Sequence, residues 1–532
     1  MSETAWTVGR YVAETLLANG IDTAFGIPGV HNIELYRGIG AARLRHVLAR
    51  HEQNAAFAAD GFARAAGRPA VVTVISGPGL TNTLTAVAQA YSDSVPMLLI
   101  ASTPVRASLG RHWGMLHELR DQRALAAGAA GLALHASTDT EVRAHLAAAL
   151  AFLSRGRPRP AYLGLPLDLL AEPTALRPER FPSPAAPPQP GPGPLTAAIE
   201  LLTQAQRPLL IAGGGARHAG GALATVLDAL DAYLVTTVAG KGVIPESHPA
   251  NLGASLTLRA TQELVTAADV VVAVGTELAE TDTYTPTRFE IPGRLIRIDI
   301  DAEMLAKPYA ADVAIHADAA ATLAALAQRL PRRRGWRSRA GDASGHRSRL
   351  EAQLSAAEHA RRSVARAIRA ALPPEGVVFT DMTQAAYSGH YAFAADRPGC
   401  WFHPCGYGTL GYALPAAIGA KVAQPQRPAI ALAGDYGVQF TLQELVTAVE
   451  LRLPLPVVVW NNESLGQIRD DMVAAGIEPL AVAGRNPDFL ALAAACGARA
   501  ERVRGATALT EELRTALRSP GPTLLEAREA DF

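Results

Sequence analysis

The chain has 532 residues, and its 49 basic side chains balance 49 acidic ones, so the formal net charge is zero. At about 150 residues per domain, this length predicts three or four domains. The lack of a basic excess argues against a general electrostatic grip on nucleic acid or on an anionic membrane. Three scattered cysteines, Cys400, Cys405 and Cys496, are too few for a disulfide framework or a zinc cluster.

The first residues, MSETAWTVGRYVAETLL, carry early charges and lack a basic segment followed by an apolar core. We therefore expect no signal peptide. No apolar run reaches the roughly 18 residues that a transmembrane helix needs, so we expect a cytoplasmic protein that makes no membrane contact.

Apolar runs of strand length alternate with Ala- and Leu-rich helical stretches along the whole chain. Continuous apolar strands between amphipathic helices are typical of parallel sheets that are covered on both faces. We therefore predict an α/β fold of doubly wound parallel sheets. The clearest expected strands are Ala70–Ile75, Met97–Ala101, Pro208–Ala212, Val270–Val274, Ala429–Ala433 and Leu455–Trp460.

Two stretches are interpreted as connectors between domains. Pro182–Pro194 is rich in proline, which predicts an extended, semi-rigid segment. Arg329–Arg349 is basic, contains Gly and Ser and has no strand pattern, so we expect a solvated connector rather than a nucleic-acid arm. These boundaries predict three domains over residues 1–180, 195–328 and 350–532, of which the first and third share a coarse strand–helix rhythm.

The most informative segment runs from Gly434 to Asn462. It begins with GDYG after one predicted strand and ends with WNNES after the next, and Phe440–Leu451 between them is predicted to be one helix. Asp435 and Asn462 should therefore meet at the same edge of a sheet. A carboxylate and an amide oxygen suit Mg²⁺, which needs few protein ligands when a phosphate supplies the others.

This spacing resembles the thiamine diphosphate motif, GDG followed after a fixed interval by NN. The resemblance implies that Asp435 and Asn462 are side-chain ligands of Mg²⁺ and that Ser464 gives a backbone carbonyl. Tyr436 stands where the family usually has a small residue, and it could change how the backbone meets the diphosphate. The acidic ligand is kept, so the motif still predicts cofactor binding.

Several further motifs, in the same order, resemble the acetohydroxyacid synthase branch of thiamine enzymes over most of the chain. They are Phe25–Gly29, HEQ and ADGFAR within Arg50–Arg64, Ser76–Asn82, Ala90–Pro96, Tyr162–Asp168, GKGVIPE within Thr237–Pro249, and Gly408–Gly419. The resemblance implies that Glu52 is the acid that activates the thiamine pyrimidine ring. On its own, Glu52 is equally a helix-start glutamate favoured by the helix dipole.

The same resemblance implies that Leu410 is the apolar support under the cofactor, a role that is compatible with ordinary core packing. It also implies cofactor contacts near the diphosphate from Thr383, Gln384, Gly408, Gly434, Gly437 and Leu465. In this family the cofactor lies between the first domain of one subunit and the third domain of its neighbour. A homodimer or homotetramer with active sites at the subunit interface is therefore expected.

The central domain departs from the flavin-binding members of the family. Gly275–Tyr284 and Gly253–Leu256 replace the patterns that usually accompany FAD, so no FAD is expected. The Gly213–Gly215 turn lacks the full dinucleotide fingerprint and its acidic partner.

The segment after Asn462 also departs from the family. Asp471, beside Asp470, stands where acetohydroxyacid synthases carry a tryptophan that selects the second 2-oxo acid. Two carboxylates suit a guanidinium group, so both residues, with Gln467, are predicted substrate contacts. An exposed acidic helix start is the ordinary alternative.

Three segments are similar to guanidino-oxo-acid decarboxylases, which act on 5-guanidino-2-oxopentanoate, and two of the segments contain histidine. The residues in question are His31 in GIPGVH and His112 and His117 in HWGMLHE, with Asp121–Gln122 following. Histidine titrates near neutrality, so each of the three could donate or relay the final proton, although each alone is an ordinary histidine.

The predicted function is therefore nonoxidative decarboxylation of a 2-oxo acid to an aldehyde with thiamine diphosphate and Mg²⁺. Three alternatives stay open at this point. They are carboligation as in acetolactate synthase, a flavin-dependent reaction as in pyruvate oxidase, and a non-catalytic regulatory relative.

Overall fold

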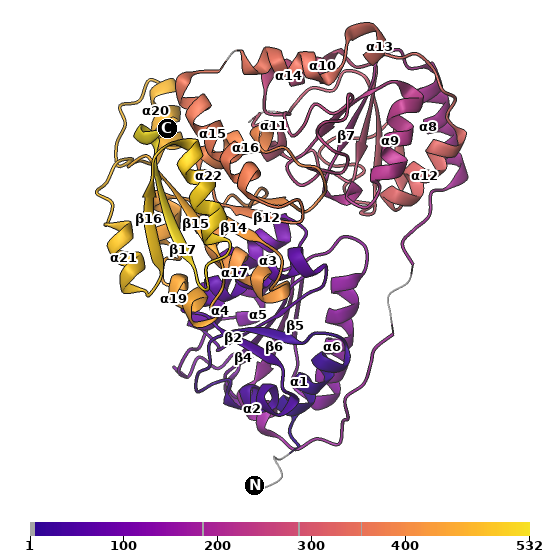
Figure 1. The fold of residues 1–532 in the computed structure, drawn as a ribbon. Helices are drawn as coiled ribbons and strands as arrows, with labels where there is room; N and C mark the ends of the chain where they lie inside the picture. Colours follow the sequence, from indigo (N-terminus) through magenta and orange to yellow (C-terminus); the bar gives the residue numbers. More distant parts are fainter. Residues whose placement is uncertain (1–5, 183–185, 286–287, 353) are drawn as a thin grey trace.

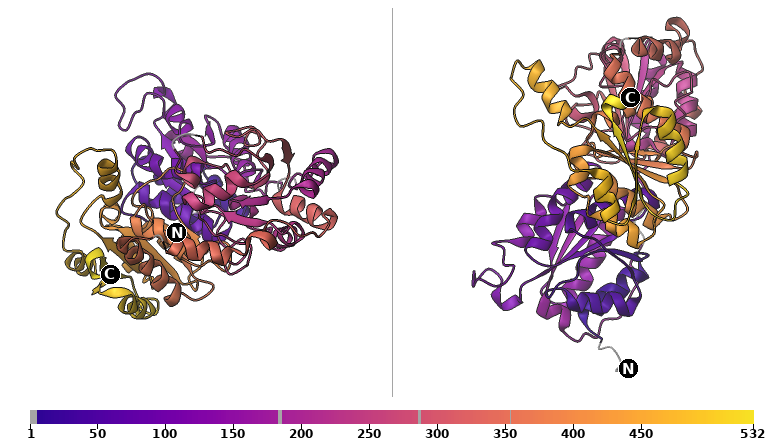
Figure 2. Two further views of the ribbon diagram at one scale, coloured as in Figure 1. Left: turned by 90° about the horizontal axis from the view of Figure 1, so that it is seen from above. Right: turned by 60° about the vertical axis from the view of Figure 1, so that its left-hand side comes forward.

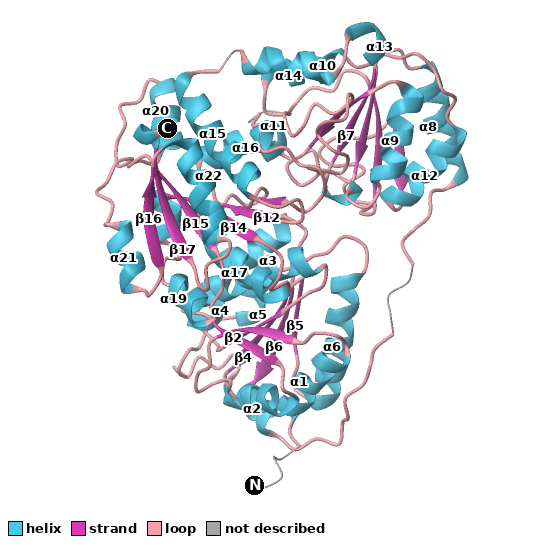
Figure 3. Ribbon diagram, viewed as in Figure 1, coloured by secondary structure: helices cyan, strands magenta, loops and turns pink. Residues whose placement is uncertain are grey.

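The computed structural model describes residues 6–182, 186–285, 288–352 and 354–532, and it contains three α/β units (Figure 1). Every sheet is parallel, and helices cover both faces of each sheet (Figure 3). The first and third units lie against each other, and the central unit lies against the third (Figures 1 and 2). The predicted fold class is confirmed. No helix in the described part of the chain is long and apolar enough to cross a membrane.

The first unit has a six-stranded sheet in the order β2-β1-β3-β4-β6-β5. Its strands are β1 (Thr23–Gly26), β2 (Arg45–Leu48), β3 (Val71–Val74), β4 (Leu98–Thr103), β5 (Leu132–His135) and β6 (Ala161–Pro166). Its helices are α1 (Val8–Ala18), α2 (Ile33–Ala42), α3 (Glu52–Ala66), α4 (Pro78–Ser92), η1 (Arg106–Ser108), α5 (Gln122–Ala127), α6 (Asp139–Ser154) and α7 (Leu167–Ala171). The central strands are buried at every position because helices cover both of their faces.

The central unit has a five-stranded sheet in the order β11-β10-β9-β7-β8. Its strands are β7 (Pro208–Ala212), β8 (Tyr233–Thr236), β9 (Val270–Val274), β10 (Arg294–Asp299) and β11 (Val313–His316). Its helices are α8 (Pro192–Gln204), η2 (Gly214–Ala216), α9 (Gly220–Leu230), α10 (Arg259–Ala267), α11 (Glu280–Thr283), α12 (Ala319–Arg329), α13 (Arg337–Ala340) and α14 (Ala343–Glu351).

The third unit has a six-stranded sheet in the order β13-β12-β14-β15-β17-β16. Its strands are β12 (Val377–Thr380), β13 (Trp401–Phe402), β14 (Ala429–Gly434), β15 (Pro456–Asn461), β16 (Arg499–Val503) and β17 (Thr523–Arg528). Its helices are α15 (Ala356–Ala371), α16 (Gln384–Ala392), α17 (Ala413–Ala423), α18 (Asp435–Gln439), α19 (Glu444–Glu450), α20 (Gly466–Ala474), α21 (Phe489–Ala495), α22 (Gly505–Ala516) and η3 (Glu529–Asp531).

The first and third sheets have the same strand order when their strands are counted along the chain, which explains the shared rhythm of their sequences. In both, the winding reverses between the first and third strands, namely between β1 and β3 and between β12 and β14. Ligands of open α/β sheets bind at the carboxyl ends of the strands where the winding reverses. The fold therefore provides one crevice in the first unit and one in the third.

One predicted helix is wrong in its bounds. Residues Phe440–Leu451 do not form a single helix, because α18 begins earlier, at Asp435, and α19 begins only at Glu444. Asp435 in the first turn favours the early start through the helix dipole. The break brings Phe440 and Thr441 against Gly411, where an added Cβ would lie 2.9 Å from the Phe440 Cβ atom.

The two predicted connectors also need correction. Residues 183–185 of the proline-rich stretch lie outside the described residues, and its last three residues open α8, with Pro192 at the first helical position. The basic stretch is not a simple solvated connector, because α13 lies within it and α14 begins within it and extends beyond its end. Trp336 is buried edge-on against Tyr233, with ring centroids 5.3 Å apart. Asp231 accepts hydrogen bonds from the backbone amides of Gly335 and Ser338.

Helix α3 of the first unit crosses α17 of the third unit in the antiparallel direction (Figure 1). Ala58 meets Gly419, whereas Gly61, farther along α3, meets Ala416, nearer the start of α17. Glycine at both crossing points allows the two backbones to touch. The start of α3 therefore lies beside the end of α17.

Candidate active site

Glu52 is the first residue of α3 and lies just beyond the carboxyl end of β2. Asn82, which lies one turn into α4, donates a hydrogen bond from Nδ2 to Glu52 Oε2 at 2.9 Å. His51 caps the helix, since its Nδ1 accepts a hydrogen bond from the backbone amide of Gln53 at 3.2 Å. The carboxyl group of Glu52 is thus positioned by a helix N-terminus and by one amide.

Two of the three predicted histidines come together at the neighbouring strand end. His31 Nδ1 forms a hydrogen bond of 2.6 Å with Ser76 Oγ, and the His31 and His117 rings are edge-on with centroids 4.8 Å apart. Burial, followed by the nearby His117, lowers the pKa of His31. Gly77 has a φ of +62° and allows this approach, because a Cβ there would lie 2.7 Å from the His117 carbonyl oxygen. His112 lies exposed farther out in the same loop.

The side chain of Gln122 holds the turn at Gly77 in place through hydrogen bonds. Its Nε2 donates to the Ser102 carbonyl at 2.8 Å and to the Tyr162 hydroxyl at 2.9 Å, and its Oε1 accepts from the Gly77 amide at 3.4 Å. A cavity of about 250 Å³, lined by Gln122 and by residues from Thr103 to Arg123, opens beside it. Asn82, Ser76 and Gln122 were not predicted as site residues, although all three lie in segments that the sequence motifs had marked.

In the third unit, Asp435 and Asn462 lie at the carboxyl ends of the paired strands β14 and β15, as predicted. Asp435 is buried, and its Oδ2 accepts a hydrogen bond of 2.7 Å from Asn486 Nδ2. Burial raises the pKa of Asp435, and the hydrogen bond from Asn486 opposes this rise. Asn486 was not predicted, because it lies far beyond the motif.

Asn462 belongs to a chain of side-chain amides. Its Nδ2 donates to Gln384 Oε1 at 3.3 Å, and Gln384 Nε2 donates to Asp470 Oδ2 at 2.8 Å. Asn462 Oδ1 accepts from the Ser464 amide at 3.2 Å. Gly466 leaves room for this chain, because a Cβ there would lie 2.5 Å from Asn462 Nδ2.

The segment around Val482 holds the turn after Asn462. Ser464 Oγ donates to the Val482 carbonyl at 3.0 Å, and the Leu465 amide donates to the same oxygen at 2.7 Å. The Tyr436 side chain reaches this segment as well, since a Cβ at Gly484 would lie 2.6 Å from the Tyr436 hydroxyl. Tyr436 is therefore accommodated by packing against residues that follow α20.

Leu410 lies half-buried in a turn that is held by Asp381. The backbone amide of Gly411 donates to Asp381 Oδ2 at 2.8 Å, and the Met382 amide donates to Asp381 Oδ1 at 2.8 Å. Burial raises the pKa of Asp381 to about 6. Gly408 and Gly411 have φ values of +69° and +87°, which favour glycine at both positions.

The predicted pair of substrate carboxylates is divided between two environments. Asp470 accepts from Gln384 and from the Arg469 guanidinium, the latter at 2.9 Å, whereas Asp471 is exposed and accepts from Gln467 Nε2 at 3.0 Å. Successive residues of a helix point about 100° apart, so the two carboxylates cannot form one bidentate site.

Glu52 and Asp435 lie at opposite ends of the contact between their units. Arg50 beside Glu52 donates its amide to Glu444 at 2.8 Å, and Arg45 reaches the Val422 carbonyl at 2.8 Å near the end of α17. Leu410 lies three residues before the start of α17 at Ala413. The run of α3 from Glu52 to Arg64 spans roughly 18 Å. Within one chain, Glu52 therefore lies near the end of α17, whereas Gly437, just after Asp435, lies beside Gly411 near the start of α17.

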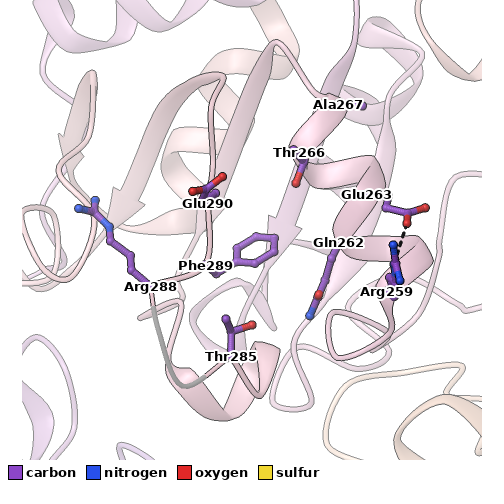
Figure 4. A pocket seen from close by; sticks show the side chains of 9 residues that line it. All are labelled: Arg259, Gln262, Glu263, Thr266, Ala267, Thr285, Arg288, Phe289 and Glu290. Atoms are coloured by element: carbon purple, nitrogen blue, oxygen red, sulfur yellow. Dashed lines mark hydrogen bonds and ion pairs between the residues drawn. The ribbon is translucent and has the colours of Figure 1, made fainter.

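A cavity of about 520 Å³ lies in the central unit and contains none of the predicted site residues (Figure 4). Its lining carries both signs of charge, and Arg259 is already paired with Glu263 at 3.1 Å. We therefore place the candidate active site at the two strand edges and not in this cavity.

Family models match three successive parts of this chain. The N-terminal TPP binding domain of thiamine pyrophosphate enzymes matches residues 6–125, the central domain residues 195–326, and the C-terminal TPP binding domain residues 381–527. The chain belongs to the thiamine pyrophosphate enzymes. The family predicted from the sequence motifs is thus confirmed.

Individual relatives cover almost the whole length of this thiamine pyrophosphate enzyme. It is 47% identical to the probable 2-ketoarginine decarboxylase AruI of Pseudomonas aeruginosa, over 98% of this chain and 94% of the relative. It is 31% identical to the acetolactate synthase large subunit of Parasynechococcus marenigrum, over 96% and 86%. It is 30% identical to the acetolactate synthase isozyme 3 large subunit of Escherichia coli, over 91% and 88%. These similarities support a thiamine diphosphate-dependent carboxy-lyase.

The residues at the third-unit edge fit Mg²⁺ and a diphosphate. Asp435 is a buried carboxylate whose pKa is raised by burial and only partly restored by hydrogen bonds, and its ionised form gains from a bound cation. No group of three or more His, Cys, Asp or Glu side chains with metal-binding geometry occurs among the described residues.

The glycines of the central unit have a packing explanation. A Cβ at Gly213 would lie 2.3 Å from the Gly275 carbonyl oxygen, so the two turns touch. Arg157 and Arg159 of the first unit form ion pairs with Glu277 in the following turn, the latter at 3.4 Å. The absence of FAD stays a prediction.

Proposed function

We propose that this enzyme decarboxylates 5-guanidino-2-oxopentanoate without oxidation, releasing carbon dioxide and the guanidino aldehyde, with thiamine diphosphate and Mg²⁺. The observation that carries the proposal is the 47% identity to a probable 2-ketoarginine decarboxylase, against 31% or less to acetolactate synthases. Carboligation to an acetohydroxyacid is the second candidate, because acetolactate synthases match the same length of chain.

Asp435, Asn462 and the Ser464 carbonyl would hold Mg²⁺. The diphosphate would meet the backbone from Gly434 to Gly437, with Gly408, Leu465 and Thr383 nearby. When bound, thiamine diphosphate supplies the electron sink for the pair of electrons that carbon dioxide leaves behind. Leu410 would support the cofactor from its apolar side, on a turn fixed by Asp381.

Glu52 would bind the pyrimidine ring nitrogen and share a proton with it. The Asn82 amide keeps one carboxyl oxygen engaged, so the other is oriented for this contact. His31 and His117 would relay the proton that completes the aldehyde, because their rings meet beside Ser76 and the lowered pKa of His31 makes its protonated ring release that proton more readily. The exposed His112 is the weaker candidate.

Asp471 and Gln467 would bind the guanidinium group of the substrate. Asp471 is exposed on α20 and accepts a hydrogen bond from the neutral Gln467, so its charge is available to a cation. Asp470 would act through Gln384 and not through the substrate, because Gln384 and Arg469 take its oxygens.

We also propose a homodimer, or a homotetramer built from such dimers, with active sites between subunits. The support is the position of Glu52 and Asp435 at opposite ends of the α3–α17 contact. Exposed apolar side chains surround both halves of the site, as expected for surfaces that a second copy covers. They are Val30, Ile33, Trp113 and Leu116 in the first unit, and Phe440, Ile468, Val473, Ile477 and Leu480 in the third.

A panel of 2-oxo acids tests the proposed reaction. Purified enzyme with thiamine diphosphate and Mg²⁺ is given pyruvate, a branched-chain, an aromatic and the guanidino 2-oxo acid, and aldehyde and acetohydroxyacid are both measured. We expect aldehyde from the guanidino acid as the dominant product. Acetolactate from pyruvate as the dominant product would instead establish the carboligase, and flavin absorption in the purified protein would favour an oxidase.

A further inference from the structure

We propose that Asn486 is a positioning residue for the metal site, which orients the Asp435 carboxylate toward Mg²⁺ as the last member of a hydrogen-bonded relay from Glu526. The inference rests on the proposed function, because it concerns the metal that the function requires. It assigns a role to the loop before α21, which no sequence motif had marked.

The relay starts from a buried carboxylate. Glu526 on β17 is 2% exposed, and its Oε1 accepts a hydrogen bond of 2.7 Å from Asn461 Nδ2. Burial acts to raise the pKa of Glu526, but hydrogen bonds from Arg502, Asn461 and Arg528 lower it below its usual value. An ionised carboxylate only accepts hydrogen bonds, so the amide nitrogen of Asn461 must face Glu526.

The orientation of Asn461 determines that of Asn486. Asn461 Oδ1 is turned away from Glu526 and accepts from Asn486 Nδ2 at 3.0 Å. The second hydrogen of the same nitrogen serves Asp435 Oδ2 at 2.7 Å. Gln439 Nε2 donates to Asn486 Oδ1 at 3.2 Å, so a flipped Asn486 amide would place two donors together. Every hydrogen bond in the relay thus has one permitted direction.

The relay leaves one oxygen of Asp435 for the metal. With Oδ2 held by Asn486, the carboxylate cannot rotate without losing this bond inside a buried site. Outer partners of this kind orient the ligand and commonly change metal affinity by about 10- to 100-fold when they are removed. The first asparagine of the NN pair is then a relay member, whereas the second is a metal ligand.

Metal titration with the Asn486→Ala enzyme tests the inference. Mg²⁺ is titrated into full-length protein with saturating thiamine diphosphate, and binding is followed by near-ultraviolet circular dichroism. We expect the dissociation constant for Mg²⁺ to rise about 10- to 100-fold, and kcat to recover toward the wild-type value at saturating Mg²⁺. A purely structural defect would not be rescued by metal.

Two further variants distinguish loss of the hydrogen bond to Asp435 from a general effect on the loop. Asn486→Asp has nearly the same shape but offers Asp435 an acceptor in place of a donor, so it should weaken Mg²⁺ binding at least as much. Asp488→Ala is the matched control, because Asp488 caps α21 in the same loop through the amides of Leu490 and Ala491 and does not touch the relay. It should lower thermal stability and leave the dissociation constant unchanged.

Two results would overturn the inference: a dissociation constant within twofold of wild type in both Asn486 variants, or an equal rise in Asp488→Ala. Wild-type protein that binds Mg²⁺ and thiamine diphosphate but decarboxylates none of the 2-oxo acids would overturn the proposed reaction alone. Wild-type protein without Mg²⁺-dependent cofactor binding would overturn both.

Discussion

Gly419 of α17 lies directly on Ala58 of α3, since a Cβ at Gly419 would lie 1.8 Å from the Ala58 carbonyl oxygen. Together with the contact between Gly61 and Ala416, this contact fixes how the antiparallel helices α3 and α17 lie against each other. Glu52 at the start of α3 is thereby directed away from the strand edge that carries Asp435. This arrangement is the basis of the proposal that a second subunit supplies the other half of each site.

Mixing two inactive variants tests this arrangement. Glu52→Gln and Asp435→Asn should each be inactive alone. In a mixed dimer, one of the two sites combines the intact Glu52 of one chain with the intact Asp435 of the other, so isolated mixed dimers should show about half of wild-type activity. Specific activity after co-expression and isolation of the mixed dimers is the measurement. Activity that stays at zero in confirmed mixed dimers would place both residues of each site in one chain.

Glu52→Gln should lower kcat by at least about 10²-fold, because glutamine cannot share a proton with the pyrimidine ring. Glutamine keeps an acceptor for the Asn82 amide, so folding and thiamine diphosphate binding should change little. Steady-state kinetics and a cofactor titration separate these effects. Unchanged turnover would remove Glu52 from the chemistry, whereas loss of cofactor binding would show a structural role.

Asp471→Asn and Asp470→Asn should differ in their effects. Asp471→Asn should raise KM for the guanidino acid by about 10-fold or more, because the guanidinium group loses a charged hydrogen bond. KM for a 2-oxo acid with an uncharged side chain should change little. Asp470→Asn should instead affect all substrates alike, since it disturbs Gln384 and through it Asn462. Equal effects of Asp471→Asn on charged and uncharged substrates would exclude Asp471 from recognition of the guanidinium.

His403 should make the fold sensitive to acid. It is buried with Nδ1 at 2.8 Å from the Thr380 hydroxyl, and burial, followed by the Arg64 charge, lowers its pKa from 6.5 to about 3. The neutral form is favoured in the folded state, so its contribution to stability is complete above about pH 6.5 and is lost as the pH falls toward 3. The expected slope is about 1.4 kcal/mol per pH unit.

Chemical denaturation across this pH window measures the effect. His403→Asn removes one titrating group, so the slope of unfolding free energy against pH should fall by about 1.4 kcal/mol per pH unit. The asparagine side chain still offers a hydrogen-bond partner to the Thr380 hydroxyl. His359→Gln, an exposed position on α15, is the control and should follow the wild-type curve. A wild-type slope in His403→Asn would mean that other groups cause the acid sensitivity.

Sequence spacing predicted the parts of the site whose geometry is local. Apolar runs located β7 and β9 to the residue, and the residues after β14 and β15 placed Asp435 and Asn462 at one edge because neighbouring parallel strands end together. Glu52 was expected to open a helix, and it does. In each case, the periodicity of apolar residues and the positions of the strand ends are enough to place the residue.

The tertiary structure decided the contacts between residues that are distant in sequence. Asn486 reaches Asp435 across 51 positions, and His117 reaches His31 from another loop. The tertiary structure also gives Asp470 and Asp471 different partners, Gln384 and Gln467, although the sequence presents the two carboxylates as a pair. Motif spacing specifies which chemical groups end each strand, but loop closure and helix packing determine which of those groups touch. For this enzyme, that packing places Glu52 and Asp435 at opposite ends of the contact between α3 and α17.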